Sequence, residues 1–289
     1  MNKKILKIIA LTVALILIAG IGFFANALVG NPVSKYLAKN AAEKLIEEKH
    51  PDKGFYVERV FYDFKMGNYS IRVKSDESPD SAFTVIAGFF GDISLDTYDD
   101  VIANKRNTAD RIWKEYRDAA DSVFDSGTFP YNTHISFGDI EFIDRESVGV
   151  PDLPSYAIVT DTLELDAYYD IRELGKKAGH LVVYIYDEEV TVERLCEILI
   201  GIKDIFNSAG VEFYAIDCVI EYPRPENDGP WREGRVEVEN FLCEDIYEEG
   251  LKDRVAENNR KMEEYYKLQD ELKEQEIAAY EEALKEQEN

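Results

Sequence analysis

The sequence predicts an α+β protein with an N-terminal transmembrane helix, two helix-backed and mainly antiparallel sheet domains, and a long C-terminal helix. Three observations predict this class. Residues 8–29 form an unbroken apolar run, short segments with period-two alternation follow it, and residues 245–289 form a charged stretch with helical spacing. Antiparallel strands that follow one another, with amphipathic helices beside them, are typical of α+β domains.

The first element is the apolar run Ile8–Val29, which contains no charged residue. As a helix it is roughly 33 Å long, enough to cross the hydrocarbon core of a bilayer. Lys3, Lys4 and Lys7 precede it, and basic flanks of this kind stay in the cytoplasm. We therefore expect residues 1–30 to anchor a single-pass cell-membrane protein with a cytoplasmic N-terminus and an extracytoplasmic body.

A cleaved signal peptide is the alternative for the same segment. Ala25-Asn26-Ala27 has the small-x-small form that signal peptidase accepts, and a basic segment precedes the apolar run. The run is longer than the about 7–15 apolar residues of a signal peptide, which favours an uncleaved anchor. Whether the chain is cut after Ala27 stays open, and in both cases the body is exported.

The composition is strongly acidic. The chain has 33 Lys and Arg residues against 58 Asp and Glu residues, a formal net charge of −25. A polyanion repels phosphate backbones, so we expect no nucleic-acid partner. Hydrophobic residues make up 45% of the chain and aromatic residues 12%, enough apolar surface for packed cores.

Residues 31–126 are predicted to form a first α+β domain with the order helix, meander, helix. Asn31 caps a helix that begins with Pro32, and the sequence His50-Pro51 ends it. A second amphipathic helix is expected over residues 108–124. The strands expected between the two helices are residues 55–64, 69–75, 82–90 and 93–98.

Residues 127–244 are predicted to form a second α+β domain with a ferredoxin-like β-α-β-β core. Asp170 and Thr191 have the side chains of helix N-caps, and Gly179 and Gly210 end the two helices that follow them. The expected strands are residues 135–142, 156–165, 181–186, 211–222 and 235–241.

Residues 245–289 are predicted to form one acidic helix. Glu257 and Lys261 are one of several favourable pairs at i,i+4 spacing. Asn258, Gln269 and Glu276 occupy seam positions that a coiled coil fills with apolar residues. This pattern favours a solvated helix that packs only near its start, and assembly through the helix is the alternative.

Cys196, Cys218 and Cys243 are an odd number of cysteines without a C-x-x-C pair, which argues against a disulfide framework and a zinc ribbon. Cys196 lies on the apolar stripe of a predicted helix, and Cys218 alternates with Ile216 and Ile220 on a predicted strand. We expect both to be small core residues. A Cys196–Cys218 disulfide stays open.

Motifs that carry chemistry are missing from the sequence. The signatures of common exported hydrolases, of phosphate loops and of dinucleotide-binding turns do not occur. His50, His134 and His180 stand at the ends of elements without partner spacing, which is typical of solvated or capping residues. The acidic clusters lack the spacing of a calcium loop. We therefore predict no catalytic residue, no cofactor and no metal site.

Aromatic residues outside the predicted cores are the candidate interaction surface. Trp231 lies beside the Pro- and Gly-containing loop 223–230, and Tyr265 and Tyr266 lie on the C-terminal helix. Tyr and Trp side chains are enriched at interfaces because they give a large contact area at low entropic cost. The alternative is that these rings fold back over a sheet edge.

Several segments of the chain resemble one family. They are Gly30-Asn31-Pro32-Val33-Ser34-Lys35 after the apolar run, Tyr62-Asp63-Phe64 with Gly67-Asn68-Tyr69, Phe213-Tyr214-Ala215-Ile216-Asp217, and Asp245-Ile246-Tyr247-Glu248-Glu249-Gly250. These segments are similar to the YfjL-like membrane proteins of Gram-positive bacteria, over nearly the whole chain. The resemblance implies an anchored ectodomain of two domains. It supplies no functional residue, because that family has no assigned activity.

The first predicted domain is also similar to PepSY-type modules. The likeness lies in its helix-then-meander order, with Phe89-Phe90-Gly91-Asp92-Ile93 at a strand turn. PepSY-type modules are exported and are linked to protease inhibition or to sensing at the envelope, so the resemblance implies a regulatory role of that kind.

The sequence thus favours a non-enzymatic, single-pass envelope protein that binds or regulates an envelope protein partner. One alternative is an extracytoplasmic hydrolase that acts on a cell-wall or peptide substrate through carboxylates. Another is a scaffold that assembles through its C-terminal helix. The identity of the partner and the oligomeric state do not follow from the sequence.

Overall fold

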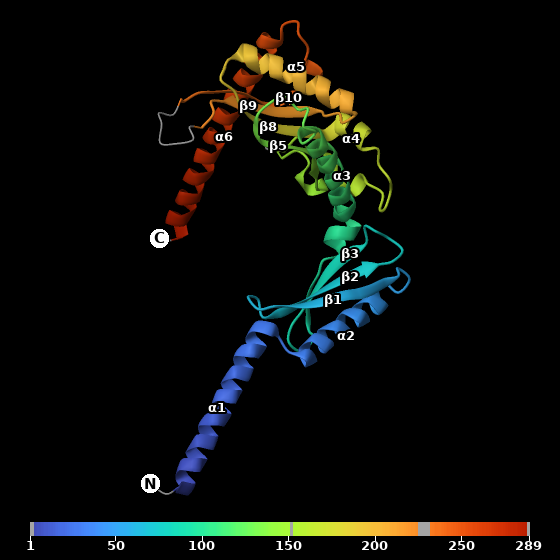
Figure 1. Ribbon diagram of the computed structural model, residues 1–289, viewed down its shortest axis with the longest axis vertical. Helices are drawn as coiled ribbons and strands as arrows, with labels where there is room; N and C mark the ends of the chain where they lie inside the picture. The colour runs from blue at the N-terminus through green and yellow to red at the C-terminus, as the bar shows by residue number, and fades with distance from the viewer. Residues whose placement is uncertain (1–2, 151–152, 225–231, 288–289) are drawn as a thin grey trace. The chain divides into compact units, whose positions relative to one another are not determined.

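The computed structural model describes residues 3–150, 153–224 and 232–287 (Figure 1). The chain divides into two compact units. Unit 1 comprises Met1–Asp110 and Thr160–Ala167, and unit 2 comprises Arg111–Val159 and Tyr168–Asn289. Each unit contains helices and a four-stranded sheet, so the predicted α+β class is confirmed.

The apolar run at the N-terminus forms a helix, α1 (Lys3–Val29). Among the residues that the structure describes, no helix is long and apolar enough to cross a membrane. The predicted transmembrane anchor over residues 1–30 is therefore wrong. The single-pass membrane localisation, with a cytoplasmic N-terminus and an extracytoplasmic body, fails with it.

The next helix and the four strands of unit 1 follow α1. They are α2 (Pro32–Lys49), β1 (Phe55–Asp63), β2 (Asn68–Ser75), β3 (Ala82–Ala87) and β4 (Ile93–Asp96), with a short helical turn over Asp99–Ala103. The four strands pair in the order β1-β2-β3-β4, and every neighbouring pair is antiparallel.

The start of α2 confirms the predicted cap. The side chain of Asn31 accepts a hydrogen bond of 2.8 Å from the Ser34 backbone N–H, and Pro32 is the first helical residue. The hydroxyl of Tyr69, a buried residue of β2, accepts a bond of 2.9 Å from the Asn31 N–H. The cap is therefore tied to the core of the sheet as well as to its own helix.

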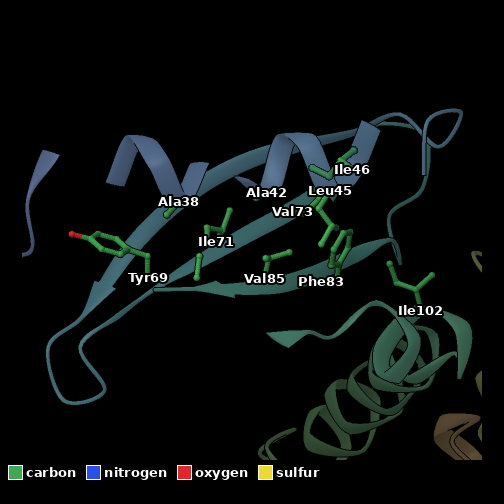
Figure 2. Close-up of a cluster of buried hydrophobic side chains, with 11 residues drawn as sticks. Ala38, Ala42, Leu45, Ile46, Tyr69, Ile71, Val73, Phe83, Val85 and Ile102 are labelled. Atoms are coloured by element: carbon green, nitrogen blue, oxygen red, sulfur yellow. The ribbon is translucent and has the colours of Figure 1, made fainter. Parts of the chain in front are cut away.

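The core of unit 1 lies between α2 and one face of this sheet (Figure 2). Side chains alternate between the two faces of a strand, so every second residue of β2 and β3 points toward the helix. Among the buried residues are Ala38, Ala42, Leu45 and Ile46 of α2, Tyr69, Ile71 and Val73 of β2, and Phe83, Val85 and Ala87 of β3.

Unit 2 is built on a second four-stranded sheet. Helix α3 (Arg106–Phe124) begins in unit 1 and continues into unit 2. The other elements of unit 2 are β5 (Thr133–Ile140), β6 (Phe142–Ile143), β7 (Ile158–Val159), α4 (Ile171–Ala178), β8 (Gly179–Tyr186), α5 (Val192–Ala209), β9 (Ala215–Glu221), β10 (Arg235–Leu242) and α6 (Leu251–Gln287). Short helical turns cover Arg145–Ser147 and Cys243–Asp245 in unit 2 and Thr160–Thr162 in unit 1.

The sheet of unit 2 has the strand order β10-β9-β8-β5. β8 and β9 are parallel and are joined through α5, whereas β5 and β10 pair antiparallel to their neighbours. Helix α5 lies along one face of the sheet (Figure 1). Leu181, Val183 and Ile185 of β8 are buried and alternate with half-buried residues, so the opposite face of β8 is less covered.

Tyr116 of α3 joins several elements of unit 2. Its side chain is fully buried, and its hydroxyl donates a hydrogen bond of 2.8 Å to the Glu212 carbonyl oxygen. A Cβ atom added at Gly138, Gly175 or Gly179 would lie only 3.1, 2.8 or 2.6 Å from an atom of the Tyr116 side chain. The ring of Tyr116 therefore occupies space that only glycine leaves open at these three positions.

Helix α6 confirms the predicted C-terminal helix. Its first turns pack on unit 2, where Leu251 and Val255 are buried. The side-chain amides of Asn258 and Asn259 then donate to the carbonyl oxygens of Glu239 (3.3 Å) and Glu237 (2.9 Å) of β10. These bonds hold α6 along the edge strand β10.

All three cysteines are free, so the Cys196–Cys218 disulfide does not form. Cys196 is 8% exposed and Cys218 is fully buried, which confirms that both are core residues. Burial raises the pKa of the Cys218 thiol to about 12, so this thiol is protonated at neutral pH.

Gly175→Ala is expected to destabilise unit 2 by more than about 2 kcal/mol, although alanine normally favours a helix interior over glycine. The added Cβ would overlap the Glu212 carbonyl oxygen and lie 2.8 Å from Cε2 of Tyr116, so backbone would have to move. Urea unfolding followed by tryptophan fluorescence measures the change.

Gly201→Ala is the matched control, because Gly201 is also a helix-interior glycine of unit 2. The added Cβ would meet only the hydroxyl end of the half-buried Tyr131 side chain and no backbone atom, so a side chain and not the backbone would have to move. We expect a change within about 1 kcal/mol. Equal losses in the two variants would show that the Tyr116 and Glu212 packing is not the cause.

Candidate functional site

The structure brings two of the three predicted interaction residues together. Tyr265 and Tyr266 of α6 pack edge to face, with ring centroids 5.5 Å apart. The Tyr266 hydroxyl donates a short hydrogen bond to Oε1 of Glu239 on β10, and this bond raises the pKa of Tyr266 to about 12. Trp231 lies outside the described residues.

Tyr265 lines a cavity of about 490 Å³ in unit 2. Cavities of this volume are of the size that holds a small molecule or a side chain of a partner. The lining comes from three strands, loops and α6: Glu141, Leu153, Pro154, Ser155, His180, Asp217, Glu239, Asn240, Met262 and Tyr265. It combines carboxylates with a histidine and an apolar wall.

His180 lies at the centre of the charged part of this lining. It is the second residue of β8, and it lies on the face of the strand opposite the buried Leu181. Its Nδ1 is 3.2 Å from Oε1 of Glu141, and its Nε2 is 2.9 Å from Oδ1 of Asp217. The side chain is only 12% exposed, so a buried imidazole ring stands between two carboxylates.

The charges around His180 keep its ring protonated. Burial alone would lower the pKa of His180, but the contacts with Asp217 and Glu141 outweigh burial and raise the pKa to about 9. At neutral pH the ring is therefore an imidazolium. Its Nε2 atom is buried and has no hydrogen bond of good geometry, so the contact with Asp217 is an ion pair and not an aligned hydrogen bond.

Tyr156 connects His180 to β10. Its hydroxyl lies 3.1 Å from His180 Nδ1 and donates a bond of 2.9 Å to Oδ1 of Asn240. Its ring packs on Tyr214, with the centroids 4.5 Å apart. Burial raises the pKa of Tyr156, so the phenol stays neutral.

An irregularity of β10 positions Glu239 and Asn240 at the cavity. The register of β10 against β9 shifts between Val238 and Phe241, so the two residues in between leave the regular ladder. Asn240 has φ of +49°, a conformation that asparagine adopts more readily than most residues. Its backbone N–H donates a bond of 2.7 Å to Oδ1 of Asp217.

The arrangement suits charge binding better than proton transfer. An imidazolium with a pKa of about 9 holds its proton at neutral pH and is a poor general base. In the part of the chain that the structure describes, His180 makes no hydrogen bond to a serine, threonine or cysteine. Likewise, no group of three or more His, Cys, Asp or Glu side chains in that part is arranged to hold a metal ion.

Sequence reasoning missed Glu141, His180 and Asp217. It interpreted His180 as a solvated or capping residue. One signal was present, because Asp217 lies within the predicted strand 211–222 between the apolar residues Ile216 and Cys218, and a carboxylate at such a position needs a partner. The partner itself depends on the pairing of β8 with β9, which places Val182 beside Asp217 and so brings His180 close.

These features define an α+β protein of two compact units with an acidic cavity in unit 2. The YfjL-like N-terminal domain matches residues 4–97, and the YfjL-like C-terminal domain matches residues 115–256. The chain belongs to the YfjL-like family, as the resemblance of its segments indicated. No curated protein and no solved structure matches the chain.

The His180 ring is expected to titrate near pH 9, because Glu141 and Asp217 stabilise its charged form more than burial disfavours it. Glu141→Gln and Asp217→Asn each remove one of these charges and should lower the pKa to about 7–8. NMR of the ring carbon protons against pH measures this pKa directly. A midpoint near 6.5 in the unchanged chain would contradict the ion-pair geometry.

The positive charge of His180 also predicts how the stability of unit 2 depends on pH. The pKa of His180 is higher in the folded chain than the 6.5 of an unfolded histidine. The contribution of the protonated His180 to the free energy of unfolding is therefore complete below pH 6.5 and is lost as the pH rises through about 9. Unit 2 should lose on the order of 3 kcal/mol over this range. Urea unfolding at a series of pH values measures the loss.

His180→Gln should remove this pH dependence, and His134→Gln should keep it. His134 is the matched control, because it stacks on Tyr186 of the same sheet and lies 3.4 Å from Glu221, away from the cavity. A His180→Gln variant that keeps the full pH dependence would assign the effect to other groups.

Proposed function

We propose that this chain is a non-enzymatic binding or regulatory protein whose binding site is the cavity of unit 2. The partner expected from the sequence is a protein. Tyr265, one of the predicted interaction residues, lines the cavity, and Tyr266 supports it through Glu239. The site therefore combines the aromatic side chains that favour interfaces with a set of fixed charges.

One observation carries the non-enzymatic assignment. The only histidine in the cavity lining stands between Glu141 and Asp217 and keeps its proton at neutral pH. General base catalysis needs a group that accepts a proton near the working pH. A fixed imidazolium instead positions the two carboxylates on either side of it, which is the task of a binding site.

A carboxylate hydrolase is the second candidate, and a specific observation favours it. Glu141, Asp217 and Glu239 line one cavity, and hydrolysis of a glycosidic bond needs two carboxyl groups across such a space. In that case one of the three carboxylates would be indispensable for activity, which separates this candidate from a binding protein.

A scaffold that assembles through α6 is the third candidate. Apolar side chains of its distal part are exposed, with Leu268 at 53%, Leu272 at 43%, Ile277 at 57% and Tyr280 at 67%.

The order of one helix followed by a four-stranded meander in unit 1 supports the proposed likeness to PepSY-type modules, and with it a regulatory role. We also propose that this chain, like the proteins its segments resemble, is a protein of Gram-positive bacteria.

Complementation of a deletion strain from a titratable promoter separates binding from catalysis. If the chain binds, Asp217→Asn should weaken binding about tenfold, and an approximately tenfold rise in expression should restore the phenotype. An enzyme that loses its general acid or base loses about 10²–10⁴-fold in rate, so the same rise would not restore it.

Glu237→Gln is the matched control for this experiment. Glu237 lies on β10 two residues before Glu239, pairs with Arg235 at 2.8 Å, and does not line the cavity. It should complement like the unchanged chain. Immunoblots confirm equal protein levels. A well-expressed Glu141→Gln, Asp217→Asn or Glu239→Gln variant that no expression level rescues would overturn the non-enzymatic function.

A further inference from the structure

The cavity of unit 2 carries an unbalanced negative charge. Its lining contains the carboxylates of Glu141, Asp217 and Glu239 and one cation, the imidazolium of His180. Three negative charges against one positive charge leave this lining with a net charge of about −2 at neutral pH. A ligand that enters it therefore gains most if it is a cation.

Each of these three carboxylates also has one oxygen that is able to accept further hydrogen bonds. Contacts within the described residues involve Oε1 of Glu141, Oδ1 of Asp217 and Oε1 of Glu239. The second oxygen of each carboxylate has no hydrogen-bond partner among those residues. Three such oxygens match the several N–H donors of an ammonium or a guanidinium group.

The rest of the lining is apolar or aromatic. Leu153, Pro154 and Met262 line the cavity together with Tyr265. Long basic side chains bury their methylene stems on apolar surface while the charged head meets polar groups. Aromatic rings add attraction for a nearby cation. The apolar wall thus suits the methylene stem of one amphipathic group, and the carboxylates suit its charged head.

We propose that this cavity binds an alkylammonium or guanidinium group on an apolar stem, which is either a lysine or arginine side chain of a protein partner or a free polyamine. The inference rests on the proposed binding function and names its ligand class. The carboxylates repel anions, and the cavity volume of about 490 Å³ accommodates a full side chain.

NMR titration of the full 15N-labelled chain at pH 7 and low salt tests the ligand class. The probes are the blocked peptides Ac-Ala-Lys-Ala-NH2 and Ac-Ala-Arg-Ala-NH2, the diamine cadaverine, and Ac-Ala-norleucine-Ala-NH2 as the isosteric neutral control. Cationic probes should cause saturable shifts of the amides of Ser155, Asp217, Asn240 and Tyr265. Norleucine peptide should bind at least tenfold more weakly.

Glu239→Gln and Glu237→Gln form the matched pair of variants. Both remove one negative charge from β10, but only Glu239 lines the cavity. Glu239→Gln should weaken binding of the cationic probes at least fivefold, whereas Glu237→Gln should change it less than twofold. Equal losses in both variants would mean that the attraction comes from the overall charge of the chain, which contradicts a specific site.

The outcomes separate this inference from the proposed function. Binding of both peptides but not cadaverine supports a protein partner, and the reverse supports a free polyamine. Saturable shifts at the same amides with the norleucine peptide would keep the cavity as a binding site but overturn the cationic ligand. No shift with any probe up to about 10 mM would overturn the ligand class.

Discussion

Tyr116 is the packing constraint on which unit 2 depends. Its buried ring lies where α3, β5, α4 and the first residue of β8 meet, and its hydroxyl bonds the Glu212 carbonyl oxygen ahead of β9. Gly179 and Glu212 are close in sequence to His180 and Asp217. Because a packed interior transmits small displacements, the position of Tyr116 sets where the two strands begin and thus where their charged residues lie.

The sequence predicted helix ends correctly where a single residue determines the end of the helix. The Asn31 cap, the Thr191 cap and the left-handed Gly210 lie where they were expected, because each depends only on its own turn of helix. The burial of Cys196 and Cys218 also followed from the apolar period of one helix and one strand. Such features need no knowledge of the tertiary fold.

Features that depend on distant partners were beyond the sequence. The expected strand over residues 156–165 shrinks to Ile158–Val159, because only the two-residue strand β6 pairs with it. The apolar run 8–29 predicted a helix correctly, but no helix among the described residues is long and apolar enough to cross a membrane. The His180 cluster joins residues from β8, β9 and the segment after β5, so their meeting depends on a strand order that periodicity does not specify.

The cluster also has an energetic consequence for the site. A buried ion pair gains little net stability over apolar packing, because both charges give up their hydration. Here the imidazolium of His180 forms ion pairs with two carboxylates that are each only partly buried, and the exposed fractions of their side chains are 29% for Glu141 and 27% for Asp217. Each carboxylate contacts His180 with one oxygen, and both residues line the cavity. A neutral residue at position 180 would leave both charges to repel each other, so His180 is what allows two carboxylates to line one small cavity.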